Sequence, residues 1–163
     1  MSAVVIDAFD FARLHEHREG KIAVADLPRL AKECVDASGT LHWSLDGGYE
    51  KYGRPDLTLT VSTTVQLQCQ RCMAPLPLEI ASKSVLVLAK NEAAADELDE
   101  LLDDEALEVI VGSKEFNVLE LIEDEVLLAL PLSPRHDVCP DASALDAVTD
   151  SKPSPFAILK GIK

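Results

Sequence analysis

Two pairs of metal-binding residue types stand out in this chain. The first pair is Cys69 and Cys72, and the second pair, His136 and Cys139, has the same spacing. Thiolates and imidazoles are the ligands that zinc prefers in closed, four-coordinate structural sites. The four residues therefore form a candidate zinc site, provided that the fold brings together two loops that are separated by 63 residues.

The same residues have ordinary structural interpretations. Cys69 falls on the apolar face of a predicted strand, where a buried cysteine acts as a small hydrophobic residue. His136 follows a predicted helix, whose C-terminal end favours a cation. A thiol-based redox or metal-sensing role for Cys69 and Cys72 is a further interpretation, because the neighbouring Arg71 favours a thiolate. No helix is predicted to begin after Cys72, however, and a helix N-terminus is the position at which thiol oxidoreductases activate a cysteine.

A helix with an acidic side is predicted just before the second pair. It is expected to begin after Asn117, which can cap it, and to end at Pro131. At about 100° per residue, one side of this helix carries three carboxylates, namely Glu120, Glu123 and Asp124. We interpret this side as a binding surface for a partner, or simply as a solvated face. Glu125 falls among apolar residues and needs a partner there, which is either Arg135 or a basic external protein.

The charge balance restricts the partners of the chain. It has 15 basic and 29 acidic residues, which gives a formal net charge of −14. Such a chain repels phosphate backbones at long range, so naked nucleic acid would need a local basic patch. A basic protein is the more suitable partner, although solubility alone also explains the charge. If RNA phosphate is contacted, Arg71 and Arg135 beside the two pairs are the residues that we expect to touch it.

Several classes of protein are disfavoured by what the sequence lacks. No basic segment precedes a long apolar run at the N-terminus, and no stretch approaches the roughly 20 apolar residues of a membrane helix. Four cysteines in such a chain indicate reduced thiols or metal ligands, so we expect a cytoplasmic protein that contacts no membrane. A glycine-rich phosphate loop, a Gly-x-Ser-x-Gly elbow and a His-Glu-x-x-His helix are also missing. The sequence thus predicts no enzyme and no small-molecule substrate.

A long strand is the clearest regular element. Apolar and polar residues alternate from Leu57 to Cys69, which predicts an antiparallel strand with one solvated face. A helix is expected to follow Asp26 and to end at residues 38–39, and residues 46–48 (Asp-Gly-Gly) resemble a hairpin turn. Shorter strands are expected at residues 21–24, 41–45, 78–80, 85–88 and 107–111.

These elements predict one domain over residues 1–163, of the α+β class. We expect a curled antiparallel β-sheet, partly open and barrel-like, with two main helices. Residues 91–106 are strongly acidic and are expected to form a flexible connection. Residues 140–155 are rich in Asp, Ser and Pro and are expected to form a flexible tail.

Four segments of the chain resemble the bacterial YceD family, the large ribosomal RNA subunit accumulation protein. They occur in the family's order and lie at residues 69–72, 119–131, 136–139 and 155–159, the last reading Pro-Phe-Ala-x-Leu. The resemblance extends from about Phe11 onward. It implies a role in synthesis, processing or stability of the 23S ribosomal RNA and supplies no catalytic residues. It also implies a basic partner, because the family's gene commonly neighbours that of a small, basic protein of the large subunit.

The sequence therefore supports two hypotheses of different classes. The first is a non-enzymatic ribosome biogenesis factor that binds a large-subunit precursor, its rRNA or a basic large-subunit ribosomal protein. The second is a thiol-based redox or metal-sensing protein that uses Cys69 and Cys72.

Overall fold

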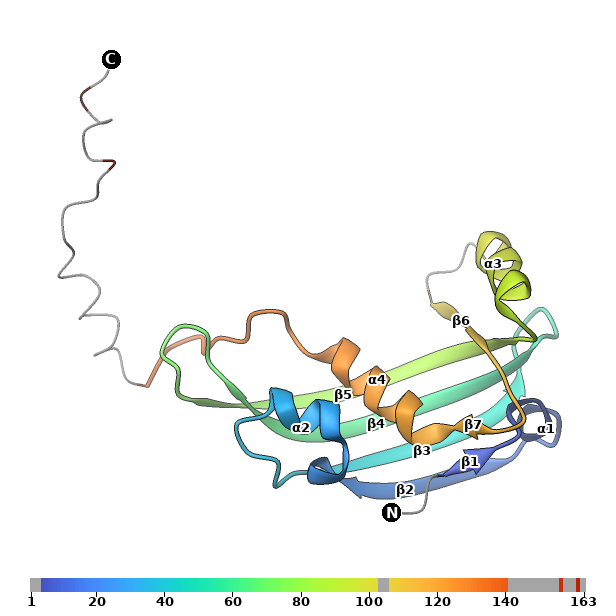
Figure 1. Ribbon diagram of the computed structural model, residues 1–163, viewed down its shortest axis with the longest axis horizontal. Helices are drawn as coiled ribbons and strands as arrows, with labels where there is room; N and C mark the ends of the chain where they lie inside the picture. Colours follow the sequence, from blue (N-terminus) through green and yellow to red (C-terminus); the bar gives the residue numbers. More distant parts are fainter. Residues whose placement is uncertain (1–3, 103–105, 141–155, 157–160, 162–163) are drawn as a thin grey trace.

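The computed structural model describes residues 4–102, 106–140, 156 and 161, and its main feature is a five-stranded sheet (Figure 1). The strands lie in the order β2-β3-β4-β5-β6, with bounds His17–Ala23, Thr40–Tyr49, Pro55–Gln68, Pro75–Ala89 and Leu107–Val111. A small second sheet pairs β1 (Val5–Ile6) with β7 (Phe116–Asn117). The helices are α1 (Ala8–Arg13), α2 (Pro28–Glu33), α3 (Glu92–Leu101) and α4 (Val118–Ala129), with a 3₁₀ turn at Val24–Asp26.

The α+β class is confirmed, but the prediction of a curled antiparallel, barrel-like sheet is wrong. Strands β2 to β5 are antiparallel neighbours, whereas β6 pairs with β5 in parallel. The chain crosses over through α3 between these two strands, and such a crossover is what allows parallel pairing. Within the described residues, the large sheet is therefore mixed and open, and neither sheet closes or curls strongly.

The long strand predicted from Leu57 is confirmed as β4. Its inward residues are buried together with Cys69, which follows the strand, and its register with β5 runs from Asp56 opposite Val87 to Gln68 opposite Pro75. The alternation of apolar and polar residues in the sequence matches their burial, because successive side chains of a strand point to opposite faces. The two longest strands thus form a hairpin that carries Cys69 and Cys72 at its tip.

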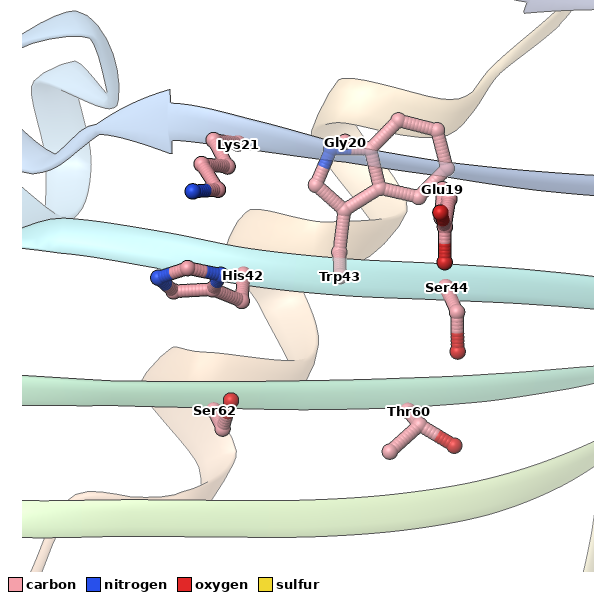
Figure 2. A pocket seen from close by; sticks show the side chains of 8 residues that line it. All are labelled: Glu19, Gly20, Lys21, His42, Trp43, Ser44, Thr60 and Ser62. Atoms are coloured by element: carbon pink, nitrogen blue, oxygen red, sulfur yellow. The ribbon is translucent and has the colours of Figure 1, made fainter.

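Helices α2 and α4 cover one face of the large sheet, and the opposite face is polar over β3 and β4. Figure 1 shows both helices on the same side, and α4 contacts both β4 and β5. Figure 2 shows the other side, with α4 behind the strands and four polar side chains in front, at His42, Ser44, Thr60 and Ser62. A shallow hollow of about 360 Å³ lies there. The main core therefore lies on the helical face, while Val87 and Ala89 at the end of β5 are buried outside it.

The prediction of a turn at residues 46–48 is wrong, because β3 continues to Tyr49. A Cβ atom at Gly47 would lie 2.3 Å from the carbonyl oxygen of Phe11. The glycine is needed for the close approach of α1 rather than for a turn. The actual turn follows Tyr49, where the backbone N–H of Glu50 donates to the carbonyl of Arg54 (2.9 Å) and Gly53 has a φ of 80°.

The two predicted main helices are only partly confirmed. Helix α4 matches its prediction, but α2 is six residues long and ends at Glu33 rather than near residue 38. The acidic segment 91–106 contains the second long helix, α3, which Asn91 caps by accepting from the N–H of Ala94 (2.8 Å). Residues 103–105 lie outside the described part. The predicted tail lies outside it too, apart from Pro140, and so does the segment 155–159, apart from Phe156.

None of the helices in the described ranges combines the length and the apolar character needed to cross a membrane.

Candidate metal centre

The candidate metal centre lies where the β4–β5 hairpin meets the chain that follows α4. Cys69 is fully buried at the end of β4, and its N–H donates to the carbonyl of Ala74 across the tip (2.9 Å). The N–H of Gln70 donates to the carbonyl of Pro134 (2.8 Å), which fastens the tip to the connection after α4. Two segments distant in sequence are thus joined by backbone hydrogen bonding next to the cysteines.

The structure brings together all four predicted ligands, Cys69, Cys72, His136 and Cys139. Their ligand atoms all lie within 4.8 Å of one another, and Sγ of Cys72 lies 3.4 Å from Nδ1 of His136. In a tetrahedral zinc site, bond lengths of about 2.3 Å to sulfur and about 2.05 Å to nitrogen separate such a pair by about 3.6 Å. Three thiols and one imidazole at these separations can hold a metal such as zinc.

Backbone donors surround the sulfur of Cys69. The N–H groups of Arg71 and of His136 each point to this sulfur at 3.4 Å. Burial opposes ionisation of the thiol, but the backbone donors outweigh it and lower the pKa of Cys69 to about 5. The site therefore stabilises a thiolate, which is the form that binds a metal. A cysteine that served only as a hydrophobic residue would not need these donors.

The pKa of Cys139 is shifted in the opposite direction to that of Cys69. Burial and the neighbouring sulfurs of Cys72 and Cys69 raise the pKa of Cys139 to about 11. Several thiolates cannot lie side by side without a compensating charge, and a divalent cation supplies that charge. The donor set therefore fits a closed structural metal site better than a set of free thiols.

Helix α4 leads into this centre, and one of its predicted solvated acids is buried. The expectation that Glu123 lies on the solvated face is wrong, because this residue is only 5% exposed. Its Oε1 accepts from the N–H groups of Arg29 (2.7 Å) and Leu30 (3.0 Å), and its Oε2 accepts from Nε of Arg29 (2.9 Å). Burial opposes ionisation here as well, yet these donors and the guanidinium hold the pKa of Glu123 below its ordinary value.

This carboxylate completes the N-terminus of α2. Leu27 is the capping residue there and offers no side-chain acceptor, while Pro28 has no N–H to satisfy. Glu123 supplies the missing acceptor for the next two N–H groups, and Leu27 itself accepts from Ala31 (2.8 Å). Helix α4 therefore caps α2 through a side chain 94 residues further along the chain.

Glu125 is buried as well, with an exposure of 8%. It accepts hydrogen bonds from the hydroxyl groups of Ser82 and of Ser84 on β5, the second at 2.6 Å. The predicted pairing of Glu125 with Arg135 is therefore wrong. The carboxylate joins α4 to the sheet instead of facing a partner.

The remaining predicted partner-binding residues are exposed. Glu120 and Asp124 face solvent on α4, where Asp124 pairs with Nη1 of Arg29 at 2.6 Å. Arg71 and Arg135 flank the metal cluster, one on each of its two segments. Sequence reasoning missed Arg29, because its partners lie more than 90 residues away. The partners of Glu125 could have been recognised in the sequence. Ser82 and Ser84 interrupt the apolar residues on the inward face of β5, and Glu125 interrupts the apolar residues of α4.

Comparison with known proteins gives a consistent result. The sequence profile of the family described as "Large ribosomal RNA subunit accumulation protein YceD" matches residues 57–163. The chain belongs to the YceD family. A protein named "Large ribosomal RNA subunit accumulation protein YceD" from Haemophilus influenzae (strain ATCC 51907 / DSM 11121 / KW20 / Rd) is 30% identical over 156 residues, which cover 88% of this chain and 86% of that protein. No solved structure matches.

The match confirms the resemblance inferred from the sequence. The YceD family is named for accumulation of the large-subunit ribosomal RNA and not for an enzyme activity. All four residues of the metal cluster lie inside the matched range.

Proposed function

We propose that this YceD-family chain is a non-enzymatic, cytoplasmic ribosome biogenesis factor that supports synthesis, processing or stability of 23S ribosomal RNA. The single observation that carries the proposal is the family match over residues 57–163. The net charge of −14 agrees with a protein that acts by binding a cationic component of the growing subunit.

The direct partner in this proposal is a component of the large-subunit precursor. A basic large-subunit ribosomal protein suits the exposed carboxylates of Glu120 and Asp124 better than bare rRNA does. Ribosomal RNA remains a second partner, for which Arg71 and Arg135 would contact phosphate groups. Charge reversal at both arginines would then weaken association with ribosomal particles and lower its dependence on salt.

We further propose that Cys69, Cys72, His136 and Cys139 bind one zinc ion. Four protein ligands leave no open position for substrate, so the ion would be structural and not catalytic. It would hold the β4–β5 hairpin against the chain after α4. Its binding free energy would then contribute to the stability of this end of the molecule.

A deletion strain tests the proposed function. We expect a reduced ratio of 23S to 16S rRNA and fewer 50S subunits on a sucrose gradient, both restored by the wild-type chain. Cys72→Ser should restore them poorly, whereas Cys34→Ser, which alters a cysteine outside the cluster, should restore them fully. Normal 23S rRNA in the deletion strain would refute the proposal.

A thiol-based redox function is the second candidate, and the gathering of three sulfur atoms within 4.8 Å favours it. Two thiols would form a disulfide while hydrogen peroxide is reduced to two water molecules. The full burial of Cys69 argues against rapid oxidation. Slow, ordinary reaction of the metal-free thiols with peroxide would eliminate this candidate.

A further inference from the structure

We propose that the groove between α2 and α4 binds a polypeptide segment that is basic at one end and apolar at the other. The inference rests on the proposed function, and it specifies where and how a protein component of the ribosome precursor binds. Two hollows of similar size lie along this groove, one acidic and one apolar.

The acidic hollow lies at the N-terminal ends of the two helices and has a volume of about 450 Å³. Its lining includes four carboxylates, from Asp26, Glu120, Glu123 and Asp124, but only one cation, from Arg29. The formal balance is 1 − 4 = −3. The guanidinium of Arg29 is already paired with Glu123 and Asp124, which leaves the exposed Asp26 and Glu120 to meet the cations of a ligand.

The apolar hollow lies at the C-terminal ends of the same helices and has a volume of about 440 Å³. Lys32 and Glu33 of α2 border it and cancel in charge. Six of its ten lining residues are apolar, namely Leu67, Leu127, Leu130, Pro131, Leu132 and Pro134, and Gln68 and Gln70 add polar groups. Leu132 is fully exposed, at 105%. Leu132 therefore adds exposed apolar surface to this hollow, which a ligand would cover.

The two hollows follow one another along the same pair of helices. Arg29 on α2 lies at the acidic end, and Lys32 of the same helix lies at the apolar end. On α4, residues 120, 124 and 127 share one stripe, because four and three residues each advance the helix by about one turn. A ligand segment lying along α4 would therefore meet carboxylates first and leucines afterwards.

The candidate metal centre supports the far wall of the apolar hollow. Pro134 lines this hollow and accepts the hydrogen bond from the N–H of Gln70. His136 follows two residues later and belongs to the metal cluster. The wall is thus held in place by the same contacts that join the hairpin tip to the connection after α4, so the groove is preorganised for binding.

A polypeptide suits this surface better than RNA does. The acidic hollow repels phosphate groups, and in the apolar hollow the carboxylate of Glu33 offsets the charge of Lys32. A segment with Lys or Arg followed by Leu, Ile or Phe matches both hollows. In such a complex the charges raise the association rate, and the buried apolar side chains supply affinity.

Capture experiments with the purified full-length chain test the inference. The probe is the total protein extracted from purified 50S subunits, at about 0.15 M salt, where charges are screened beyond about 8 Å. The test variants are Leu132→Asp and Glu120→Lys. Their matched controls are Leu101→Asp and Glu97→Lys on the exposed surface of α3. Figure 1 shows α3 at the opposite end of the sheet from the hairpin tip.

We expect both test variants to lower the capture of identified ribosomal proteins by about tenfold or more, and both controls to stay within about twofold of wild type. A photo-crosslinking residue at position 132 should join the chain to a ribosomal protein. Equal capture by test and control variants would overturn the inference. So would crosslinks of position 132 to RNA alone when intact 50S subunits are used as the probe.

Expression of the same variants in the deletion strain separates the two proposals. If the deletion lowers 23S rRNA and the Leu132→Asp variant restores it fully, the groove is not the binding site but the proposed function stands. If the deletion leaves 23S rRNA normal, the proposed function itself fails. Folding of each variant is verified by its thermal unfolding, which an exposed substitution should leave nearly unchanged.

Discussion

Replacement of Glu123 by alanine should destabilise the protein substantially, although its neighbours Glu120 and Asp124 on α4 are exposed. The side chain is 5% exposed and is the acceptor for two N–H groups at the start of α2. In Glu123→Ala these donors lose their acceptor, and the N–H of the fully buried Leu30 is left without a replacement from water. The change therefore removes a helix cap and creates an unsatisfied buried donor.

The lost helix cap and the unsatisfied buried donor together set the expected loss of stability. Loss of a helix cap costs about 1 kcal/mol, and an unsatisfied buried donor costs about 1–2 kcal/mol. The free energy of unfolding should thus fall by about 2–3 kcal/mol in urea denaturation. For a chain of this size, the midpoint of thermal unfolding should fall by about 5–10 °C. Asp124→Asn serves as the control, because Asp124 is exposed and pairs with Nη1 of Arg29 instead of accepting from the N–H groups at the start of α2.

The pH dependence gives an independent check. The folded protein holds the pKa of Glu123 below its ordinary value, so the unfolded chain binds the proton more tightly. The stabilisation is therefore complete above the unfolded pKa of about 4.3 and is lost as the pH falls through the folded pKa. The difference in stability between wild type and Glu123→Gln should shrink in that acidic range. Equal stabilities of wild type and Glu123→Ala at pH 7 would refute the proposed capping of α2.

Three other perturbations test further contacts. Glu125→Ala should lower the free energy of unfolding by about 1–3 kcal/mol. A double-mutant cycle with Ser84→Ala should show coupling, because the two side chains share a 2.6 Å hydrogen bond, and additive effects would contradict this contact. Asn117→Ala should cost about 1 kcal/mol in urea denaturation, because its Oδ1 caps α4 at the N–H of Leu119 (3.1 Å); an unchanged midpoint would contradict the cap. A strong zinc chelator should increase proteolysis within residues 131–139, and unchanged cleavage would show that no metal holds this segment.

The sequence alone was sufficient for the elements with strong periodicity. Alternation identified β4, and the spacing of apolar residues with a capping asparagine identified α4. The four cluster residues were also recognisable, because zinc uses few ligand types and the two half-sites have matching spacing.

The rest depended on contacts between distant segments, which a single sequence does not display. The strand β6 is parallel to β5 because α3 forms a crossover within an acidic stretch that resembles a flexible connection. Glu123 resembles a solvated residue in the helical pattern, yet it caps a helix that lies 94 residues earlier. Gly47 resembles a turn residue, but it makes room for α1. In each case tertiary packing overrides the local pattern.

The central claim is that one zinc ion joins the β4–β5 hairpin to the chain after α4. Elemental analysis by mass spectrometry of the purified protein, expressed in zinc-supplemented medium, measures it directly. We predict about one zinc per chain in wild type and in Cys34→Ser, and nearly none in Cys72→Ser. Wild-type protein without zinc, or Cys72→Ser with a full equivalent, would contradict the claim.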